Sequence, residues 1–299
     1  MPILNSKILE QKSKRTLRRK KQRLANIARA EKMHQLRTNT IIDKTVISNP
    51  SKLNKKQYHV GCSGWFYWHW RTVFYPPTLS TSQWFDHYAH HFKTVELNAP
   101  FYSWPTQATV KAWTRQAGRK QMIYTVKVCE LITHIKRFKN TKRLIQDFGY
   151  IADILGKKMG CFLFQLPPSF HYTPIRLKNI LNQLDHSRRN VVEFRHSTWW
   201  NETVYAAFRY TGTIFCSCSG PGLPDKLIKT ADDIYIRFHG TKQWYRYNYS
   251  KEELEKWVQR ILECEPQRVW AYFNNDQEGN AIKNAQVFLK LLKVKDRSQ

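Results

Sequence analysis

The chain has 299 residues, 41% of them hydrophobic, which is enough to bury a substantial core. It has no apolar run of membrane-spanning length and no secretory signal pattern, so we expect no membrane span and no secretion. Lysine and arginine outnumber aspartate and glutamate by 50 to 22, giving a net charge of +28, which is typical of proteins that meet polyanions such as nucleic acid or anionic membrane. The six cysteines are scattered without CxxC pairs, which favours a cytoplasmic protein.

The first 57 residues differ from the rest of the chain in charge and composition. They hold 16 basic and 3 acidic residues and no aromatic residue, with too little apolar material for a core. Their apolar residues form no clean helical stripe, which argues against an interfacial membrane helix. We expect a flexible basic arm, disordered or conditionally helical, which either contributes affinity for nucleic acid or is only a solvated extension.

From residue 58 onward, strand-like and helix-like segments alternate. Strands are predicted near 58–62, 93–98, 122–128, 160–165, 190–195, 212–217, 233–239 and 268–274. Helices are predicted between them, for example at 82–88, 141–155 and 250–257, the last opening with the capping-box pair Ser250 and Glu253. Eight strands in a span of this length predict one α/β domain, residues 58–299, folded as a (β/α)8 TIM-like barrel. An open doubly wound sheet is the alternative, but no Gly-rich first turn supports it.

Several predicted strands end in polar or charged residues. In a barrel of this type the chemistry sits at the carboxyl ends of the strands, so these side chains should converge on one pocket. Alternation along each strand places them in pairs on one face, toward the barrel axis. The pairs are Glu96 with Asn98, Thr125 with Lys127, Glu193 with Arg195, Arg237 with His239, and Asn274 with Asp276.

Charges buried on this axial face need partners, so we expect the three carboxylates, of Glu96, Glu193 and Asp276, to be matched by three cations. These cations are Lys127, Arg195 and Arg237. A pocket that holds them suits a phosphate, a sulfate or a carboxylate. The alternative is an ion-paired plug for the barrel mouth with no chemistry of its own.

Specific roles follow from these residue types. The candidate catalytic residues are Glu96, Glu193, His239 and Asp276, which could also hold a divalent metal. The candidate substrate- or anion-binding residues are Asn98, Lys127, His134, Gln165, Arg195, Arg237, Asn274 and Asn275. Six aromatic residues in segments that follow strand ends could stack on bases or sugars, or could pack the barrel mouth. They are Trp65, Trp68, Tyr102, Trp199, Trp200 and Trp244.

From about Val60 to Leu292, the sequence resembles the YecE-like family, a domain family of unknown function (number 72). The resemblance is carried by ordered motifs: Gly61-Cys62-Ser63-Gly64-Trp65, His69-Trp70-Arg71, Thr94-Val95-Glu96-Leu97-Asn98, Phe164-Gln165-Leu166-Pro167-Pro168, Val192-Glu193-Phe194-Arg195-His196 and Tyr272-Phe273-Asn274-Asn275-Asp276. It implies a TIM-like barrel and brings no established activity. The architecture is similar to that of metal-dependent endonucleases that open abasic sites in DNA, which is an analogy of fold only.

Two functions of different classes remain. The first is an enzyme, such as a metal-assisted phosphodiesterase, that acts on a nucleic acid or nucleotide at the barrel rim. The second is a non-catalytic protein that binds nucleic acid or senses a small anion, with the basic arm supplying affinity. Glycoside hydrolysis by Glu96 and Glu193 ranks third, because the surrounding cations favour an anionic ligand.

Overall fold

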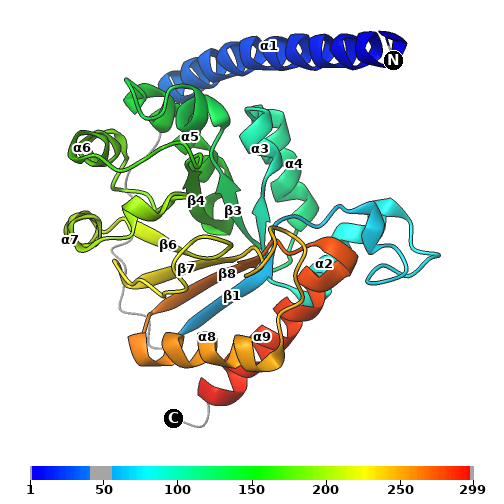
Figure 1. Cartoon of the computed structure of the whole chain (residues 1–299), viewed down its shortest axis with the longest axis vertical. Helices are drawn as coiled ribbons and strands as arrows, with labels where there is room; N and C mark the ends of the chain where they lie inside the picture. Colours follow the sequence, from blue (N-terminus) through cyan, green and yellow to red (C-terminus); the bar gives the residue numbers. More distant parts are fainter. Residues whose placement is uncertain (1, 41–55, 297–299) are drawn as a thin grey trace.

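The computed structural model describes residues 2–40 and 56–296, with the side chains of the first helix described from residue 13. Eight strands form one sheet in the order β1-β8-β7-β6-β5-β4-β3-β2, and every ladder between them is parallel. The strands are β1 (Gln57–Cys62), β2 (Thr94–Leu97), β3 (Ile123–Lys127), β4 (Met159–Gln165), β5 (Asn190–Glu193), β6 (Ile214–Ser219), β7 (Asp233–Phe238) and β8 (Arg268–Phe273). Together with the surrounding helices they form a nearly closed barrel (Figure 1), which confirms the predicted TIM-like fold.

The sheet closes between β1 and β2 through a side chain. These two end strands lie against one another, but no ladder joins them in the described part of the chain. Instead, the Tyr88 hydroxyl accepts a hydrogen bond from the Cys62 amide of β1 (2.9 Å) and donates one to the Thr94 carbonyl of β2 (3.0 Å). A Cβ at Gly61 would lie 2.3 Å from that carbonyl, so glycine is required for this close approach.

Helices surround the barrel and connect its strands. They are α2 (Trp84–His91), α3 (Ala99–Tyr102), α4 (Gln107–Ala117), α5 (Lys142–Leu155), α6 (Pro174–Gln183), α7 (Glu202–Thr211), α8 (Lys251–Cys264) and α9 (Asn280–Asp296), with a short π-helical turn η4 (Leu131–Ile135) after β3. The predicted helices at 82–88, 141–155 and 250–257 are confirmed, since they overlap α2, α5 and α8, although residues 82–83 belong to a short 3-10 turn before α2. None of the described helices combines the length and apolarity that a membrane crossing requires.

The predicted capping box starts α8. Ser250 Oγ accepts a hydrogen bond from the Glu253 amide, and the Glu253 carboxylate accepts one from the Ser250 amide. We expect Ser250→Ala to lower the free energy of unfolding by about 1 kcal/mol, because the helix loses a satisfied amide. Urea unfolding measures this, and Ser250→Asp, which can still cap, should retain most of the stability.

Alternation along the strands separates two environments. Apolar side chains such as Leu97, Phe194 and Phe238 point outward and pack beneath the helices in the main core. Inside the barrel, a second apolar cluster that includes Leu163, Tyr235 and Tyr272 fills the interior. The axial polar residues at the strand ends therefore lie above a packed floor.

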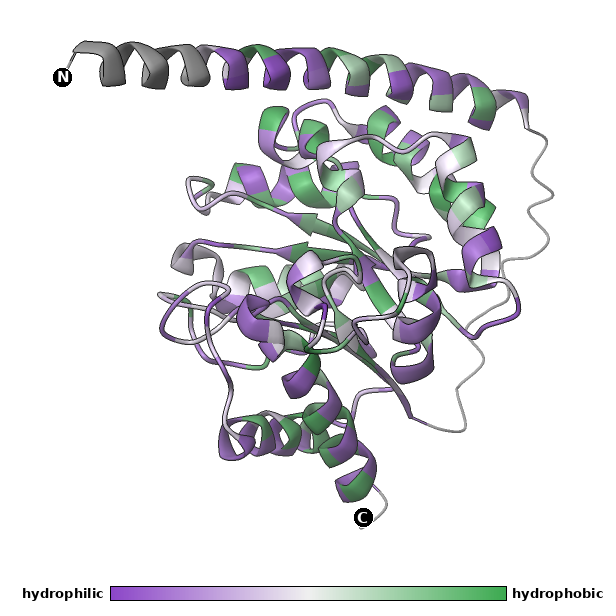
Figure 2. Cartoon of the chain, turned by 90° about the vertical axis from the view of Figure 1, so that its right-hand side faces the viewer, coloured by the Kyte–Doolittle hydropathy of each residue, from purple (hydrophilic) through white to green (hydrophobic). Residues whose placement is uncertain are grey.

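A long helix, α1 (Pro2–Asn39), lies along the outside of the barrel (Figure 2). Met33 and Ala30 are buried against the barrel, and His34 and Arg37 both pair with the buried Asp147 of α5 at 2.9 and 2.8 Å. Disorder and conditional helicity were both expected for the basic arm, and the structure describes its residues 2–39 as helix. Residues 41–55 of that arm lie outside the described residues.

Candidate functional site

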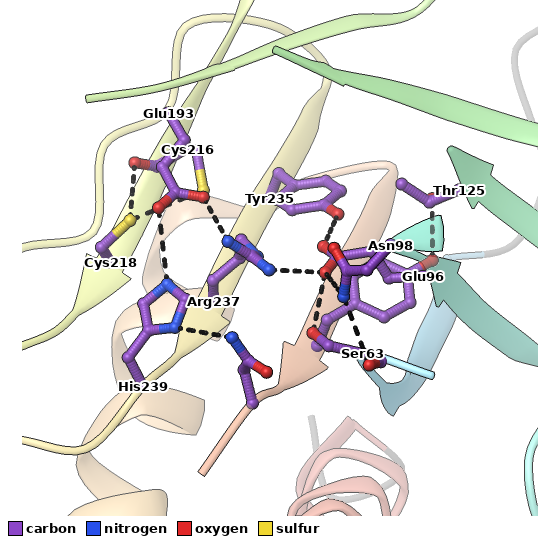
Figure 3. Close-up of polar contacts among 12 residues, drawn as sticks. Ser63, Glu96, Asn98, Thr125, Glu193, Cys216, Cys218, Tyr235, Arg237 and His239 are labelled. Carbon is purple, nitrogen blue, oxygen red and sulfur yellow. Dashed lines mark hydrogen bonds and ion pairs between the residues drawn. The ribbon is translucent and has the colours of Figure 1, made fainter. Parts of the chain in front are cut away.

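A buried ion-paired cluster lies at the carboxyl ends of the strands, with Arg237 of β7 at its centre. The Arg237 guanidinium donates to Glu193 Oε2 through Nη1 and to Glu96 Oε1 through Nη2, both at 2.6 Å. All three side chains are essentially excluded from solvent. Figure 3 shows Arg237 between the two glutamates, which come from β5 and β2 on different sides of the ring. The predicted convergence of these three residues is thus confirmed by their contacts.

The Glu96 carboxylate is fully engaged. Besides Arg237, its Oε1 accepts hydrogen bonds from Ser63 Oγ (2.7 Å) and Asn98 Nδ2 (3.4 Å), and its Oε2 accepts one from the Tyr235 hydroxyl (2.6 Å). The Asn98 side chain also donates to the Ser63 carbonyl (3.2 Å), while its own Oδ1 is buried without a hydrogen-bond partner among the described residues. An orphaned buried acceptor of this kind is unusual and favours a ligand that donates a hydrogen bond.

Glu193 is shared between three basic groups. Its Oε1 accepts a hydrogen bond from Arg195 Nε and lies 3.5 Å from His239 Nε2, while Arg237 holds Oε2. Burial alone would raise the pKa of Glu193, but Arg195 and Arg237 hold it well below its usual range. Burial and the same two arginines depress the pKa of His239, so its imidazole is neutral near pH 7.

Of the two arginines in this cluster, Arg195 is the one that keeps some exposure to solvent. Its guanidinium lies over the Trp244 ring, 4.4 Å from the centroid, and its Nη2 lies 3.1 Å from His239 Nε2. Its Nη1 has no hydrogen bond to any described residue, and the side chain is 9% exposed. Asn274 is also at this side, with Nδ2 3.3 Å from His239 Nδ1. An arginine with an open donor fits recognition of an oxyanion.

Lys127, at the end of β3, is the cation without a carboxylate partner. Its ammonium lies over the Phe101 ring, 4.0 Å from the centroid, and it forms no ion pair with a described residue. Burial, with the positive charge of Arg237, lowers its pKa to about 7, although Glu193 opposes this shift. His134 contacts the edge of Phe101, and burial together with Lys127 lowers its pKa to about 4. The cluster therefore has three cations for two carboxylates.

Asp276 does not join this cluster. Its carboxylate accepts a hydrogen bond from Trp70 Nε1 (2.6 Å) and lies 2.9 Å from His69 Nε2. Both of these partners belong to the segment after β1. The expectation that Lys127, Arg195 or Arg237 would match it is therefore wrong, because the loop after β1 supplies its partners instead. Burial raises the pKa of Asp276, and His69 partly offsets this.

Other predicted site residues serve mainly to hold segments together. Asn275 bonds the Tyr247 carbonyl and Asn284, and Gln165 donates to the Leu166 carbonyl. Trp199 is buried, stacks on Phe194 at 4.0 Å and donates to the Phe170 carbonyl, so it packs rather than faces the opening.

The other five predicted aromatic residues differ in exposure. Trp65, Trp200 and Trp244 are half-buried, Trp65 against Phe85. Tyr102 and Trp68, in contrast, are 62% and 61% exposed. Of the six predicted stacking residues, these two are exposed platforms.

Sequence reasoning missed two members of the site, Ser63 and Tyr235, which complete the shell of Glu96. Tyr235 could have been found, because it precedes Arg237 by two positions and so shares its face. Ser63 comes from a loop, whose direction the strand pattern does not encode. Trp244, a predicted stacking residue, lies beneath the Arg195 guanidinium.

One group of potential metal ligands occurs among the described residues, namely Glu193, Cys218 and His239, whose donor atoms lie within 4.8 Å of one another. It fits a divalent cation poorly. Both Glu193 oxygens are already bonded to guanidinium groups, and Arg195 approaches the His239 nitrogen that would have to ligate. Two adjacent arginines would also repel a cation.

The fold and the rim cluster define a TIM-type barrel with an ion-paired polar site at the carboxyl ends of its strands. The family model described as "Protein of unknown function DUF72" matches residues 59–299, and the chain belongs to this family. The expected resemblance to the YecE-like family is thereby confirmed, because the domain of unknown function number 72 is the same family.

Individual relatives agree with this assignment. The UPF0759 protein YunF of Bacillus subtilis (strain 168) is 24% identical over 274 residues, which cover 79% of this chain and 95% of YunF. The crystal structure of a DUF72 family protein from Thermotoga maritima is similar at 28% identity with a TM-score of 0.72, covering 79% of this chain and 99% of that one. A DUF72 family protein from Enterococcus faecalis, at 20% identity and a TM-score of 0.65 over 80% of this chain and 98% of that one, shares the fold.

Proposed function

We propose that the barrel rim is the active site of an enzyme that acts on a phosphate-bearing substrate of the nucleotide or nucleic-acid class. The observation that carries this proposal is the unpaired cation. Lys127 has no carboxylate partner, and Arg195 keeps an unbonded Nη1 at the opening. A phosphate between them would neutralise the excess charge and take bidentate or single hydrogen bonds from both groups.

The residues present suit cleavage of a phosphate ester by positioning and acid–base chemistry. Arg195 would stabilise charge on the phosphoryl oxygens, since it is preorganised by Glu193 and by Trp244. Lys127, with a pKa of about 7, can release or supply a proton near neutral pH. The glutamates act as positioning residues here, because every oxygen of Glu96 and Glu193 already accepts a hydrogen bond. A metal-assisted route is not part of this proposal, because the nearby ligand set fits a cation poorly.

The binding step can be tested directly with pyrophosphate, AMP and a dinucleotide in calorimetric titrations. We expect Arg195→Gln to weaken binding by at least about tenfold, because a charge-assisted hydrogen bond is worth about 1.5 to 3 kcal/mol. Arg209→Gln, which changes an exposed arginine on α7, should bind as the wild type does. For the dinucleotide, whose phosphodiester keeps the same charge over this range, we also expect affinity to fall as the pH rises from 6 to 8, because Lys127 in the free protein loses its proton near pH 7. Equal affinity of wild type and Arg195→Gln for all three probes would refute anion binding at the rim.

A second function, sensing of a small anion without turnover, is favoured by the complete hydrogen bonding of both glutamates. Measuring turnover distinguishes the enzyme from the sensor. Hydrolysis of bis(4-nitrophenyl) phosphate and of dinucleotides that disappears in Lys127→Gln supports the enzyme, whereas saturable binding with no turnover of any of these substrates supports the sensor.

A further inference from the structure

The middle of α1, residues 13–25, is strongly basic and exposed. Residues 13–25, here called the basic overhang, contain no acidic residue. They contain seven basic ones, which are Lys14, Arg15, Arg18, Arg19, Lys20, Lys21 and Arg23, all exposed. At 1.5 Å per residue, the basic overhang is about 20 Å long. It lies outside the residues that match the family.

Contacts along α1 show which way the basic overhang points. Near the end of α1, Thr40 bonds Tyr150 in the second half of α5, and further back Glu31 pairs with Arg143 in the first turn of α5. Because α5 follows β3, its first turn lies toward the carboxyl ends of the strands. Moving from residue 40 toward residue 26, the contacts of α1 therefore approach the rim that carries the candidate site. Residues 13–25 continue in that direction, past α5 (Figure 1).

The helix is fixed to the rim at the base of the basic overhang. Asn26 is buried, donates to the Tyr102 carbonyl at 3.1 Å and accepts from the Trp104 amide at 2.9 Å. Arg29 donates to Ser103 Oγ. These bonds hold α1 on the end of α3 and the loop that follows it, and a buried amide with both groups satisfied is a specific anchor.

The anchored loop is part of the candidate site. Tyr102, whose carbonyl Asn26 holds, has an exposed ring, and its neighbour Phe101 lies under the Lys127 ammonium. The basic overhang and Lys127 are thus linked through one short segment, α3 and the loop that follows it. Exposed aromatic rings at the same rim, Tyr102 and Trp68 (61% exposed), offer faces for stacking.

We propose that the basic overhang and the rim site form one continuous binding surface for single-stranded nucleic acid. This inference rests on the proposed function and deepens it, because it makes the substrate a polynucleotide. Basic residues cover most of the circumference of the helix, and its exposed apolar stripe is narrow, consisting of Leu17 and Leu24 one heptad apart. Such a stripe is too small to insert into a bilayer, which favours a polyanionic chain over a membrane. The exposed aromatic residues favour unpaired bases over a duplex.

The primary test is fluorescence anisotropy with a labelled 20-nucleotide oligouridylate and a 20-base-pair duplex, across a salt series with the full chain. The overhang variant replaces Arg15, Arg18, Arg19, Lys20 and Lys21 with Gln. The matched control replaces five exposed lysines elsewhere, which are Lys157, Lys251, Lys256, Lys290 and Lys293. We expect the overhang variant to bind oligouridylate at least about tenfold more weakly than the wild type at 0.1 M salt, with a shallower salt dependence. The affinity of the control variant should fall much less. Equal losses in the two variants, or tighter binding of the duplex, would overturn the proposal.

Continuity with the rim is tested by photocrosslinking an oligonucleotide that contains 4-thiouridine, followed by peptide mapping. We expect crosslinks both in residues 13–25 and at Tyr102. Crosslinks confined to α1 would reject the continuous surface. The proposed function can fail on its own. It fails if pyrophosphate binding does not depend on Arg195 while oligouridylate binding still depends on the basic overhang.

Discussion

Arg237→Met is expected to destabilise the fold by about 3 to 5 kcal/mol, measured as the free energy of unfolding in urea at pH 7. The substitution leaves the carboxylates of Glu96 and Glu193 buried without the guanidinium that joins them. Against a typical stability of about 5 to 15 kcal/mol, this is a large fraction. It is the largest effect that we expect from a single substitution in the rim cluster.

The pH dependence gives this prediction a distinct signature. In the wild type, the pKa of Glu193 is held below its value of about 4.5 in the unfolded chain. The contribution of Glu193 to the free energy of unfolding is therefore fully present above pH 4.5 and is lost as the pH falls toward the lower pKa of the folded protein. In Arg237→Met, Glu193 loses one of the two arginines that oppose the effect of burial, so its pKa should be higher than in the wild type and the difference in stability between variant and wild type should shrink as the pH falls from 7 to 5. Arg188→Met, which removes a partly exposed pair with Asp153, is the control and should cost less than about 1 kcal/mol. A loss no larger than that of the control would contradict the central role of Arg237.

Lys127→Met, in contrast to Arg237→Met, is expected to raise the free energy of unfolding, by about 1 to 3 kcal/mol at pH 6. Because the folded-state pKa of Lys127 is lowered to about 7, keeping the ammonium charged in the folded protein costs free energy below pH 7. That cost declines as the pH rises from 7 toward 10.5, so the difference between variant and wild type should narrow over this range. Urea unfolding at several pH values measures it.

The same substitution separates a binding role from a structural one. Lys127→Met should lose the increase in melting temperature that pyrophosphate gives the wild type, although the variant is itself more stable. Lys120→Met removes a half-exposed surface pair with Asp86 and should keep the pyrophosphate response. A destabilised Lys127→Met that still responds to pyrophosphate would show that the lysine supports the fold and not the ligand.

Much of the fold follows from local pattern, and the reason is visible in β7 and β5. Phe238 and Phe194 pack outward while Arg237 and Glu193 face the axis, so a period of two in the sequence maps directly onto two environments. The prediction succeeded for Glu96, Glu193 and Arg237 because the strand itself orients them. It failed for the partners of Asp276, because His69 and Trp70 arrive from a loop whose path depends on tertiary packing.

The strand pattern also carried no information about α1. Its docking depends on a few residues, among them Asn26 and the pair of His34 and Arg37 on Asp147, which are spaced along a helix that otherwise reads as solvated. Composition therefore indicated the positive charge of this segment and left disorder and helicity as alternatives. It could not give the direction in which the helix extends. That direction is what joins the basic overhang to the rim.

The Tyr88 bridge joins β1 and β2 at the one seam of the barrel that has no backbone ladder among the described residues. Everywhere else the ring is held by backbone ladders, but here one phenol hydroxyl takes the place of a ladder bond. The strands on either side lead directly to Ser63 and Glu96, whose side chains share a hydrogen bond across this seam. The seam that lacks ladder bonds among the described residues therefore lies beside the carboxylate that accepts the most hydrogen bonds in the cluster, so a separation of β1 from β2 would break one of those bonds.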